Sequence, residues 1–447
     1  MSLSNLSSIL YGFTDMNTLN ERGPLVLNYG KNIYVYDIHN NKYMDANSGL
    51  WNCVAGFDHP GLVETAIKQY KKFAGYHSLF GRLTDTAVQL ADKLIEISPF
   101  NAGRVFFTNS GSEANDTAVK ILWMLNKRKG KANKRKIITR LNAYHGVTIG
   151  ASSMTGKPYN EEFGMPLNDF IHTDNPHYWK HRNSNETEVE FSERLGKSLE
   201  DLIIHQDPET IAGFFAEPVM GAGGVIPPPK NYFNIIQPIL KKYNIPFIVD
   251  EVICGFGRTG NLWGLETYNI DPDMIIASKC ITAGFFPMGA VIIRKEIADQ
   301  FVEISEQAEE FPHGFTSGGH PVGCAIAIKA IDVILKEGLL ENVKNISPYF
   351  IKKLNEFKDY DNVGEIRGIG LMGAIEIVKD KTSKTPFESS LSIGEKIAIK
   401  SMENGLICRP IGASIVLCPQ FIVTEKQLDD LFNMLHKSLK TTFENLN

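Results

Sequence analysis

Three separate segments of the sequence carry side chains that could serve one kind of chemistry. The first runs Thr108-Asn-Ser-Gly-Ser-Glu-Ala-Asn115, where a β-rich run meets a helical pattern. Gly111 lets the backbone approach a ligand, the unpaired N–H groups at the start of the helix suit a phosphate, and Ser112 adds a hydroxyl. An ordinary capping box between Ser110 and Glu113 is the competing explanation, and the phosphate site requires Glu113 to fold back on that cap.

An acid and a lysine each follow another apolar run. Asp250 ends the run Pro246–Asp250, and Lys279 comes two residues after the run Met274–Ala277. A carboxylate at a strand end lies at the edge of the sheet where open α/β folds bind ligands. A desolvated lysine there has a lowered pKa and can form a Schiff base. Taken singly, the acid could equally be a cap or loop residue, and the lysine an exposed surface residue.

Together, these three segments match the needs of one cofactor. Pyridoxal 5′-phosphate requires an anchor for its phosphate, an anion beside its ring nitrogen and an amine for its aldehyde. The sequence has no G-x-x-x-x-G-K-[ST] motif, and no strand-borne G-x-G-x-x-G followed by an acid, which are the patterns typical of nucleotide sites. We therefore predict a pyridoxal phosphate site at one edge of a sheet.

The central part of the chain alternates short apolar runs with helical periodicity. A helix is expected at Tyr232–Tyr243, and another has its apolar face at Ala114, Ala118, Ile121, Leu122 and Leu125. Strands are expected at Arg104–Thr108, Lys136–Arg140, Ile211–Ala216, Pro246–Asp250, Met274–Ala277 and Ala290–Ile293. This alternation indicates an α/β fold with a mainly parallel sheet and helices on both faces.

The last third of the chain has a different pattern, typical of a smaller α+β unit. Helices are expected at Pro321–Lys336, Ile393–Glu403 and Lys426–Leu439, and strands at Ile369–Val378 and Ile407–Leu417. Near the other end of the chain, Ile33–Asp37 also has a strand pattern. We therefore expect a large domain over residues 58–324 and a small domain formed by residues 1–57 and 325–447.

Composition excludes several classes of protein. The chain has 447 residues, 43% of them hydrophobic, so it can bury a large core. Its net charge of −5 argues against nucleic acid as the main partner. The six cysteines form no C-x-x-C pair, so neither a zinc site nor a disulfide scaffold is predicted. With no apolar run long enough for a membrane span and no expected signal peptide, a cytoplasmic location is predicted.

The order of motifs resembles a known family. The chain is similar to class III aminotransferases of the fold-type-I pyridoxal phosphate enzymes, and most like the (S)-selective amine–pyruvate ω-transaminases. The resemblance rests on Thr108–Asn115 and on Asp45-Ala-Asn-Ser-Gly-Leu-Trp51, Asn142-Ala-Tyr-His-Gly-Val-Thr148, Ala216-Glu-Pro-Val-Met-Gly-Ala222, Asp250-Glu-Val-Ile-Cys-Gly-Phe-Gly-Arg-Thr-Gly260, Ser278-Lys-Cys-Ile-Thr-Ala-Gly284, His313-Gly-Phe-Thr316 and Ile407-Cys-Arg-Pro410. It implies a large domain with a seven-stranded sheet.

The resemblance also implies residue roles. Lys279 is then the Schiff-base lysine and Asp250 the partner of the ring nitrogen. Tyr144 and Val252 cover the two faces of the ring, and Thr316 reaches the phosphate in the neighbouring subunit of a homodimer with shared active sites. The implied cofactor-binding residues are Ser110, Gly111, Ser112, Tyr144, Glu217, Asp250, Val252, Lys279 and Thr316. The implied substrate-binding residues are Phe13, Leu50, Trp51, Phe80, Tyr144, Val147, Ala222 and Arg409, the last holding a carboxylate and swinging away for an uncharged amine.

The implied reaction moves an amino group from a primary amine or ω-amino acid to pyruvate, giving alanine by a ping-pong mechanism. The alternatives are a β-alanine– or taurine–pyruvate aminotransferase, a related mutase or decarboxylase, and a non-catalytic protein that keeps the fold. Without the resemblance, the aromatic residues would be ordinary core side chains, and His145 is expected to be a structural hydrogen bonder. Three positions depart from the usual pattern, namely Cys280, Ala283 and Gly318.

Overall fold

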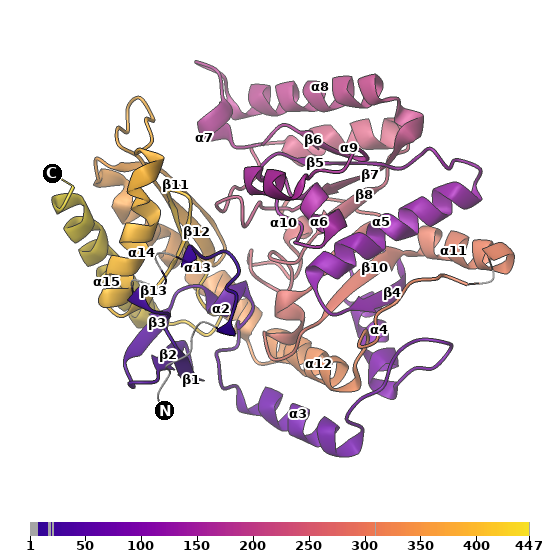
Figure 1. The fold of residues 1–447 in the computed structure, drawn as a ribbon, viewed down its shortest axis with the longest axis horizontal. Coiled ribbons are helices and arrows are strands. Elements are labelled where there is room, and N and C mark those ends of the chain that lie inside the picture. The colour runs from indigo at the N-terminus through magenta and orange to yellow at the C-terminus, as the bar shows by residue number, and fades with distance from the viewer. Residues whose placement is uncertain (1–7, 17–18, 20–21, 309, 447) are drawn as a thin grey trace.

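The fold is organised around a seven-stranded sheet. The computed structural model describes residues 8–16, 19, 22–308 and 310–446. The strand order is β4-β10-β9-β8-β7-β5-β6. Figure 1 labels β4, β10, β8, β7, β5 and β6 of this sheet. The bounds are β4 (Ala102–Thr108), β5 (Lys136–Arg140), β6 (Phe170–Thr173), β7 (Ile211–Ala216), β8 (Phe247–Asp250), β9 (Met274–Ala277) and β10 (Gly289–Arg294). All six predicted strands of this region are confirmed, whereas β6 lacks a distinctive pattern and is not predicted.

The sheet is mainly parallel, as predicted. Neighbouring strands from β6 through β9 pair in parallel, and only β10 runs antiparallel to β9 and β4. In register, Asp250 pairs with Ile276. Parallel pairing therefore brings the carboxyl ends of β8 and β9 together, and with them Asp250 and Lys279.

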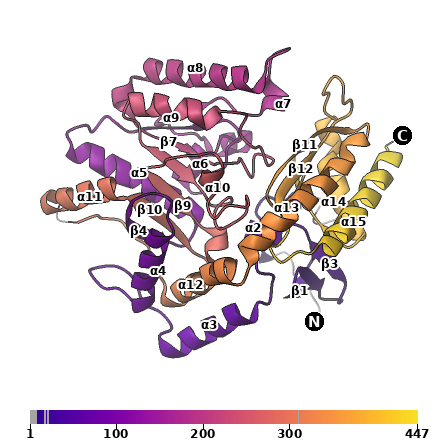
Figure 2. The same cartoon turned by 180° about the vertical axis from the view of Figure 1, so that it is seen from behind.

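Alternating side chains divide the core into two layers. Phe214, Ile275 and Ile292 pack toward the helices α8 (Glu188–Gln206), α9 (Tyr232–Lys242) and α12 (Pro321–Lys336). Their chain neighbours Phe215, Ile276 and Val291 pack toward α5 (Gly111–Arg128), α6 (Ile149–Met154) and α11 (Lys295–Ala308). Strand side chains alternate between faces, so nearly every position of these strands must be apolar. Figure 2 shows the same layers from behind.

Two smaller sheets lie beside this core. One has the order β1-β2-β3-β13 and the other the order β11-β12-β15-β14. Their strands are β1 (Leu27–Lys31), β2 (Tyr34–Asp37), β3 (Lys42–Asp45), β11 (Val363–Ile369), β12 (Met372–Ile377), β13 (Leu406–Ile407), β14 (Arg409–Ile411) and β15 (Ser414–Leu417). Because β13 pairs in parallel with β3, the two ends of the chain share one sheet, as Figure 1 shows. The domain boundaries at residues 58 and 324 stay a prediction.

The remaining helices complete these layers. They are α2 (Ser48–Trp51), α3 (Pro60–Lys72), α4 (Asp85–Glu96), α7 (Tyr178–His181), α10 (Gly264–Thr267), α13 (Leu339–Asn355), α14 (Ile393–Glu403) and α15 (Glu425–Glu444). Short 3-10 turns occur at Pro158–Phe163, Pro208–Thr210, Lys279–Thr282, Glu356–Asp359 and Ser389–Leu391. The predicted helices around α9, α12, α14 and α15 are confirmed. No helix within the described ranges has the length and apolar character to cross a bilayer.

Two predicted strands of the small unit are wrong in their extent. The run Ile369–Val378 contains the end of β11, a turn and β12, because Gly370 adopts a left-handed φ of +57°. The run Ile407–Leu417 is divided between β13, β14 and β15, with Gly412 at φ +59° in the turn of a hairpin. In both cases apolar residues continue through the turn, so hydrophobicity alone does not reveal the reversal.

One buried arginine ties the small sheet to the large one. From β11, Arg367 donates from Nη2 to the Gly224 carbonyl at 2.8 Å and to Glu376 at 2.8 Å, and it also pairs with Glu365 through Nη1. Gly224 belongs to the loop after β7. Arg367 Nη2 also donates to Ser414 Oγ of β15 at 3.0 Å, so it holds the β14–β15 hairpin, which carries Arg409, against the loop after β7.

Candidate active site

The amino end of α5 has the features of both predicted interpretations. Ser110 Oγ accepts the Glu113 N–H at 3.2 Å, which is the expected cap. The Glu113 carboxylate folds back and accepts the Asn109 N–H at 2.6 Å. Glu113 therefore satisfies a backbone N–H and does not line the pocket, whereas Gly111 and Ser112 do. A cap and a phosphate site coexist here without charge conflict.

Two glycines shape the space around this helix end. A Cβ at Gly111 would lie 2.8 Å from Val252 Cγ2, so no larger residue fits. Gly146 has a φ of +133°, and a Cβ there would lie 2.2 Å from Ser112 Oγ. Ser112 Oγ in turn accepts the Val147 N–H at 3.1 Å. Glycine at both positions allows the loop after β5 to close over the helix end.

Asp250 is held by three donors. Its Oδ2 accepts from Asn115 Nδ2 at 2.9 Å and from His145 Nδ1 at 2.8 Å, and its Oδ1 accepts the Val252 N–H at 3.0 Å. All these groups are buried or partly buried. Because donors face both of its oxygens, the Asp250 carboxylate is fixed in orientation. His145 is thus the structural hydrogen bonder that the sequence suggests, but its target is the predicted cofactor acid.

Lys279 begins the turn after β9 in a strained conformation. Its φ is +47°, in the left-handed region that a lysine rarely adopts. Ser278 beside it is fixed by a hydrogen bond from its Oγ to the Met288 carbonyl at 2.7 Å. Burial lowers the pKa of the Lys279 amine, against the opposing effect of Asp250 and Glu217. A larger neutral fraction of the amine makes it a better nucleophile toward an aldehyde.

The predicted cofactor residues gather around one pocket, except for two. Its lining consists of Gly111, Ser112, Tyr144, His145, Gly146, Glu217, Asp250, Val252, Ile253, Ser278 and Lys279. Ser110 is the helix cap beside this pocket. Thr316 lies on an exposed loop and does not line it. The structure thus brings seven of the nine predicted cofactor residues together, and the pocket also includes His145, Gly146, Ile253 and Ser278, to which the sequence assigns no such role.

Glu217 fixes the Tyr144 backbone. Its Oε1 accepts the Tyr144 N–H at 3.2 Å and its Oε2 accepts the Gly221 N–H at 3.0 Å. Arg140 donates to the Glu217 carbonyl at 2.7 Å. Burial raises the pKa of Glu217, and His145 and Arg140 partly oppose that effect. The acid thus connects the loops after β5 and β7 at the rim of the pocket.

A second, larger cavity adjoins the first at Tyr144. It is also lined by Phe13, Ala222 and Arg409 among the predicted substrate residues. The Arg409 guanidinium lies 5.3 Å from the Trp51 ring centre, and within the described chain it forms no ion pair or hydrogen bond with an acid. Burial lowers the pKa of Arg409. A half-buried cation without an acidic partner suits a carboxylate brought by a substrate.

Lys157 is a residue of this cavity that sequence reasoning misses. Its ammonium donates to Asn142 Oδ1, and burial lowers its pKa to about 8. It follows a glycine in a loop, so no spacing rule distinguishes it from a surface lysine. The cavity therefore contains a second basic side chain, whose pKa of about 8 is close to neutral pH.

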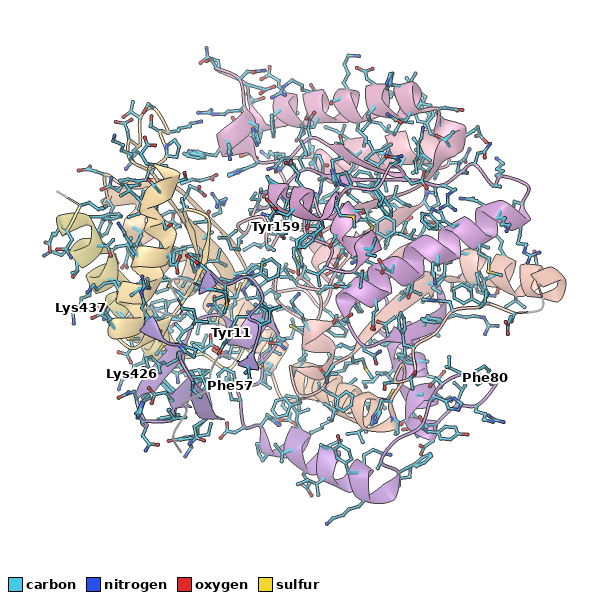
Figure 3. All side chains as sticks on the ribbon, viewed as in Figure 1. Tyr11, Phe57, Phe80, Tyr159, Lys426 and Lys437 are labelled. Carbon is cyan, nitrogen blue, oxygen red and sulfur yellow. The ribbon has the colours of Figure 1, made fainter. Side chains whose placement is uncertain are left out.

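Five predicted substrate or cofactor residues are exposed in this single chain. Phe80 is 80% exposed and lies at the periphery of the molecule, far from Tyr159 of the second cavity, as Figure 3 shows. Phe13 lines the second cavity but is 74% exposed. Leu50, Val147 and Thr316 are also exposed.

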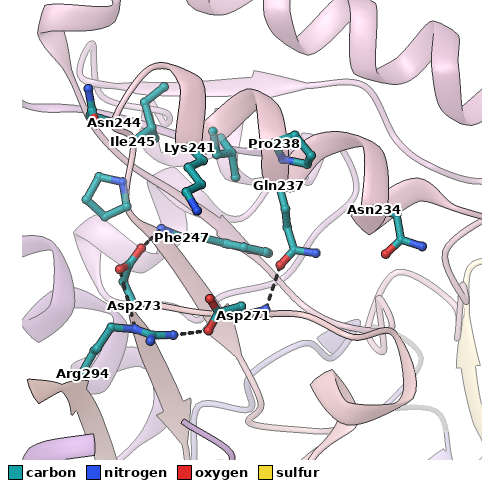
Figure 4. Close-up of a pocket in the computed structure, with 12 residues that line it drawn as sticks. Asn234, Gln237, Pro238, Lys241, Asn244, Ile245, Phe247, Asp271, Asp273 and Arg294 are labelled. Carbon is teal, nitrogen blue, oxygen red and sulfur yellow. Dashed lines mark hydrogen bonds and ion pairs between the residues drawn. The ribbon is translucent and has the colours of Figure 1, made fainter. Parts of the chain in front are cut away.

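Another pocket lies at the opposite edge of the sheet, near the amino ends of β8 and β9 (Figure 4). Three of its four charged side chains have partners. Arg294 pairs with Asp271, the Asp271 N–H donates to Gln237 at 2.7 Å, and Asp273 accepts the Phe247 N–H at 2.8 Å. These pairs stabilise the loops between strands, so both acids and the arginine of this lining are already engaged in structural contacts.

The first pocket fits pyridoxal phosphate on the chemistry of its lining. A helix amino end beside Ser112 suits a phosphate, Asp250 is a fixed anion, and Lys279 offers an amine of lowered pKa. The fold and this constellation at the carboxyl ends of the strands define a pyridoxal-phosphate-dependent transferase of fold type I.

The chain belongs to the class III aminotransferases, because the family profile described as aminotransferase class-III matches residues 17–439. It is 57% identical to an aminotransferase from Vibrio fluvialis in its PMP-bound form, with a TM-score of 0.98 and coverage of 99% of this chain and 98% of the other. An omega-aminotransferase from Paracoccus denitrificans is 58% identical, with a TM-score of 0.98 and 99% coverage of both chains.

A curated relative, gamma aminobutyrate transaminase 1, mitochondrial, of Solanum lycopersicum, is 44% identical over 421 residues, which are 94% of this chain and 82% of the relative. These findings confirm the predicted family, fold class and enzyme class. They also confirm pyridoxal phosphate as the cofactor.

Proposed function

We propose that this aminotransferase moves an amino group from a primary amine or ω-amino acid to pyruvate, giving alanine by a ping-pong mechanism. The observation that carries the proposal is the Arg409 cation, which has no acidic partner and shares its cavity with Tyr144 and apolar walls. Such a cavity accepts a carboxylate in one half-reaction and an apolar group in the other. The similarity to omega-transaminases supports this choice.

Residues of the chain have separate tasks in this proposal. Bound pyridoxal phosphate supplies a ring that accepts the electron pair left on the substrate carbon. Lys279 Nζ would hold the cofactor through its aldehyde, and its free amine would move the proton of the amine-bearing substrate carbon as base and acid. Asp250 would be the partner of the ring nitrogen, and Tyr144 and Val252, which line the same pocket, would cover the ring. Glu217 orients Tyr144 through its N–H.

The test is alanine formation from pyruvate with a panel of donors. Aryl amines, β-alanine, taurine and γ-aminobutyrate should each be offered at equal concentration to the holoenzyme. The proposal expects alanine with at least one of the aryl amines. Alanine formation with only β-alanine or taurine would instead support the alternative, a β-alanine– or taurine–pyruvate aminotransferase. γ-Aminobutyrate belongs in the panel because the curated relatives are named for it. Alanine formation with none of these donors would contradict the proposal.

Replacing Arg409 by alanine should damage the two half-reactions unequally. We expect kcat/KM for pyruvate to fall by about 100-fold, since the loss of a charge-assisted bidentate contact costs about 2–3 kcal/mol. The half-reaction with an aryl amine should change by less than about threefold, because that donor needs no cation. Stopped-flow spectra of each half-reaction measure both values.

Arg135→Ala is the matched control, because Arg135 also lies over an indole ring, that of Trp123, but is far from the cavity. It should leave both half-reactions unchanged. Equal losses in the two half-reactions of Arg409→Ala would exclude the carboxylate-binding role.

We also propose that the active sites are completed by a second copy of the chain. On α3, Val63, Ile67 and Tyr70 form an exposed apolar stripe, between 43% and 52% exposed, that continues to Phe73 and Phe80. An exposed apolar patch of this kind is typical of an interface. A homodimer would bury this stripe and bring the partner's Phe80 and the partner's Thr316 toward the pocket.

The cysteines are thiols, which supports a cytoplasmic location.

A further inference from the structure

The loop that carries Thr316, residues 310–320 between α11 and α12, lies on the outside of its own protomer. Thr316 is exposed, and its predicted target is the phosphate bound by the partner subunit. A hydroxyl can reach a phosphate across an interface only if its loop keeps one conformation. The groups that fix this loop therefore matter for the neighbouring site.

His313 fixes the loop through a chain of hydrogen bonds with assignable protons. Lys120 Nζ lies 3.1 Å from His313 Nδ1, and an ammonium can only donate, so Nδ1 accepts. The other nitrogen, Nε2, then carries the proton and donates to Thr117 Oγ1 at 2.9 Å. The Thr117 hydroxyl donates to the Glu113 carbonyl at 2.7 Å. This order requires a neutral imidazole, and burial lowers the His313 pKa to about 4.

Packing reinforces the hydrogen bonds. The His313 ring stacks on Phe106 of β4 with ring centres 5.4 Å apart and an angle of 11°, and the edges of Phe311 and Phe315 meet it at 5.3 and 5.0 Å. Further along the loop, a Cβ at Gly318 would lie 2.7 Å from the Phe107 carbonyl oxygen. The loop therefore lies directly on β4, which explains why glycine occupies position 318.

Glu113 and Thr117 both belong to α5, the helix whose amino end lines the protomer's own phosphate pocket. We propose that His313 is a positioning residue that couples this helix to the Thr316 loop. The helix that anchors one cofactor phosphate would thus also set the loop that completes the partner's site. The inference rests on the proposed homodimer with shared sites, and it assigns His313 no contact with substrate or cofactor.

The first test is cofactor affinity, measured by titrating the apoprotein with pyridoxal phosphate and following protein fluorescence. His313→Phe keeps the stacking ring but removes both hydrogen bonds, and it should raise the Kd about fivefold to thirtyfold, the range expected for one or two neutral bonds. Thr117→Val should act similarly, whereas Thr117→Ser keeps the hydroxyl and should remain near the wild-type Kd.

His320→Phe is the matched control, since His320 ends the same loop and stacks on Phe286 but contacts no residue of α5 in the described chain. It should not change the Kd. An unchanged Kd in both His313→Phe and Thr117→Val would overturn the proposal.

A heterodimer test separates action on the partner from action on the same chain. Differently tagged chains are combined so that only one retains Lys279, and borohydride-trapped label on that lysine is measured against cofactor concentration. When Lys279→Ala and His313→Phe are on the same chain, the other chain keeps Lys279, and its site is completed by the altered loop. The cofactor concentration that gives half-maximal labelling should then rise about fivefold to thirtyfold. With the two substitutions on opposite chains, labelling should be near that of a Lys279→Ala/wild-type heterodimer.

The reverse pattern, or equal shifts in both arrangements, would overturn the coupling across the interface. Failure of the proposed reaction is distinguished independently, because it shows as a lack of alanine formation by the wild-type homodimer while these affinities remain measurable.

Discussion

The Lys279→Ala variant is expected to lose covalent cofactor attachment and to lower transamination at least about 10⁴-fold, the upper range for loss of a positioned general acid–base. Lys279 supplies the only amine among the described residues that line the cofactor pocket. No other group there can hold the cofactor and then move the substrate proton. Borohydride reduction followed by peptide mapping measures the attachment, and alanine formation from pyruvate measures the rate.

Lys134→Ala provides the matched control for removing a buried lysine. The pKa of Lys134 is also lowered by burial, but its ammonium bonds the Asn244 carbonyl far from the pocket. This variant should keep both trapped cofactor and activity, although it can lose stability. Trapped label at another lysine in Lys279→Ala, with activity within about tenfold of wild type, would contradict the assignment of the cofactor lysine.

The position of the pocket is predictable because it depends on a rule of topology. Parallel strands that end in Asp250 and in Ser278-Lys279 must present those side chains at one edge, and the register of β8 with β9 does so. The preceding apolar runs are short, buried and β-branched, so their assignment to strands is secure. Geometry that follows directly from strand order is therefore recoverable without coordinates.

The contacts that tune the pocket are not predictable in this way. His145 reaches Asp250 across 105 positions of sequence, and Asn115 reaches it across 135. Nothing in the Tyr-His-Gly run distinguishes a histidine that orients an acid from one that only forms a hydrogen bond to the backbone of a loop. The sequence also gives no means to see that Lys157 lines the same cavity as Arg409, because that cavity is formed by segments far apart in the chain.

The departures from the family pattern have local physical causes where the structure shows them. Gly318 is required by its approach to the Phe107 carbonyl. Ala283 adopts a φ of +49°, a conformation that glycine would accept at lower cost, and Cys280 donates from Sγ to the Trp51 carbonyl at 3.4 Å. The turn after Lys279 thus keeps its conformation because its contacts outweigh the backbone strain, without the usual glycines.

The Asp250→Asn variant is expected to lower kcat about 10²- to 10³-fold or more at saturating cofactor, the usual effect of losing one preorganised electrostatic partner. The amide has no negative charge, so the ring nitrogen loses the group that keeps it protonated. The substitution also conflicts with the surrounding donors. Oδ2 accepts from Asn115 and His145, and Oδ1 accepts the Val252 N–H, so either orientation of the amide points an NH₂ group at a donor.

Asp273→Asn separates the loss of a partly buried charge from the loss of the cofactor's partner. Asp273 is also an acid at a strand end, although only partly buried; burial raises its pKa, and it accepts the Phe247 N–H at 2.8 Å. It lies at the amino edge of the sheet, so its replacement should reduce thermal stability and leave kcat within about threefold of wild type. If Asp250→Asn changed only the cofactor Kd and regained full kcat at saturation, Asp250 would be an anchor of the cofactor and not the partner of its ring nitrogen.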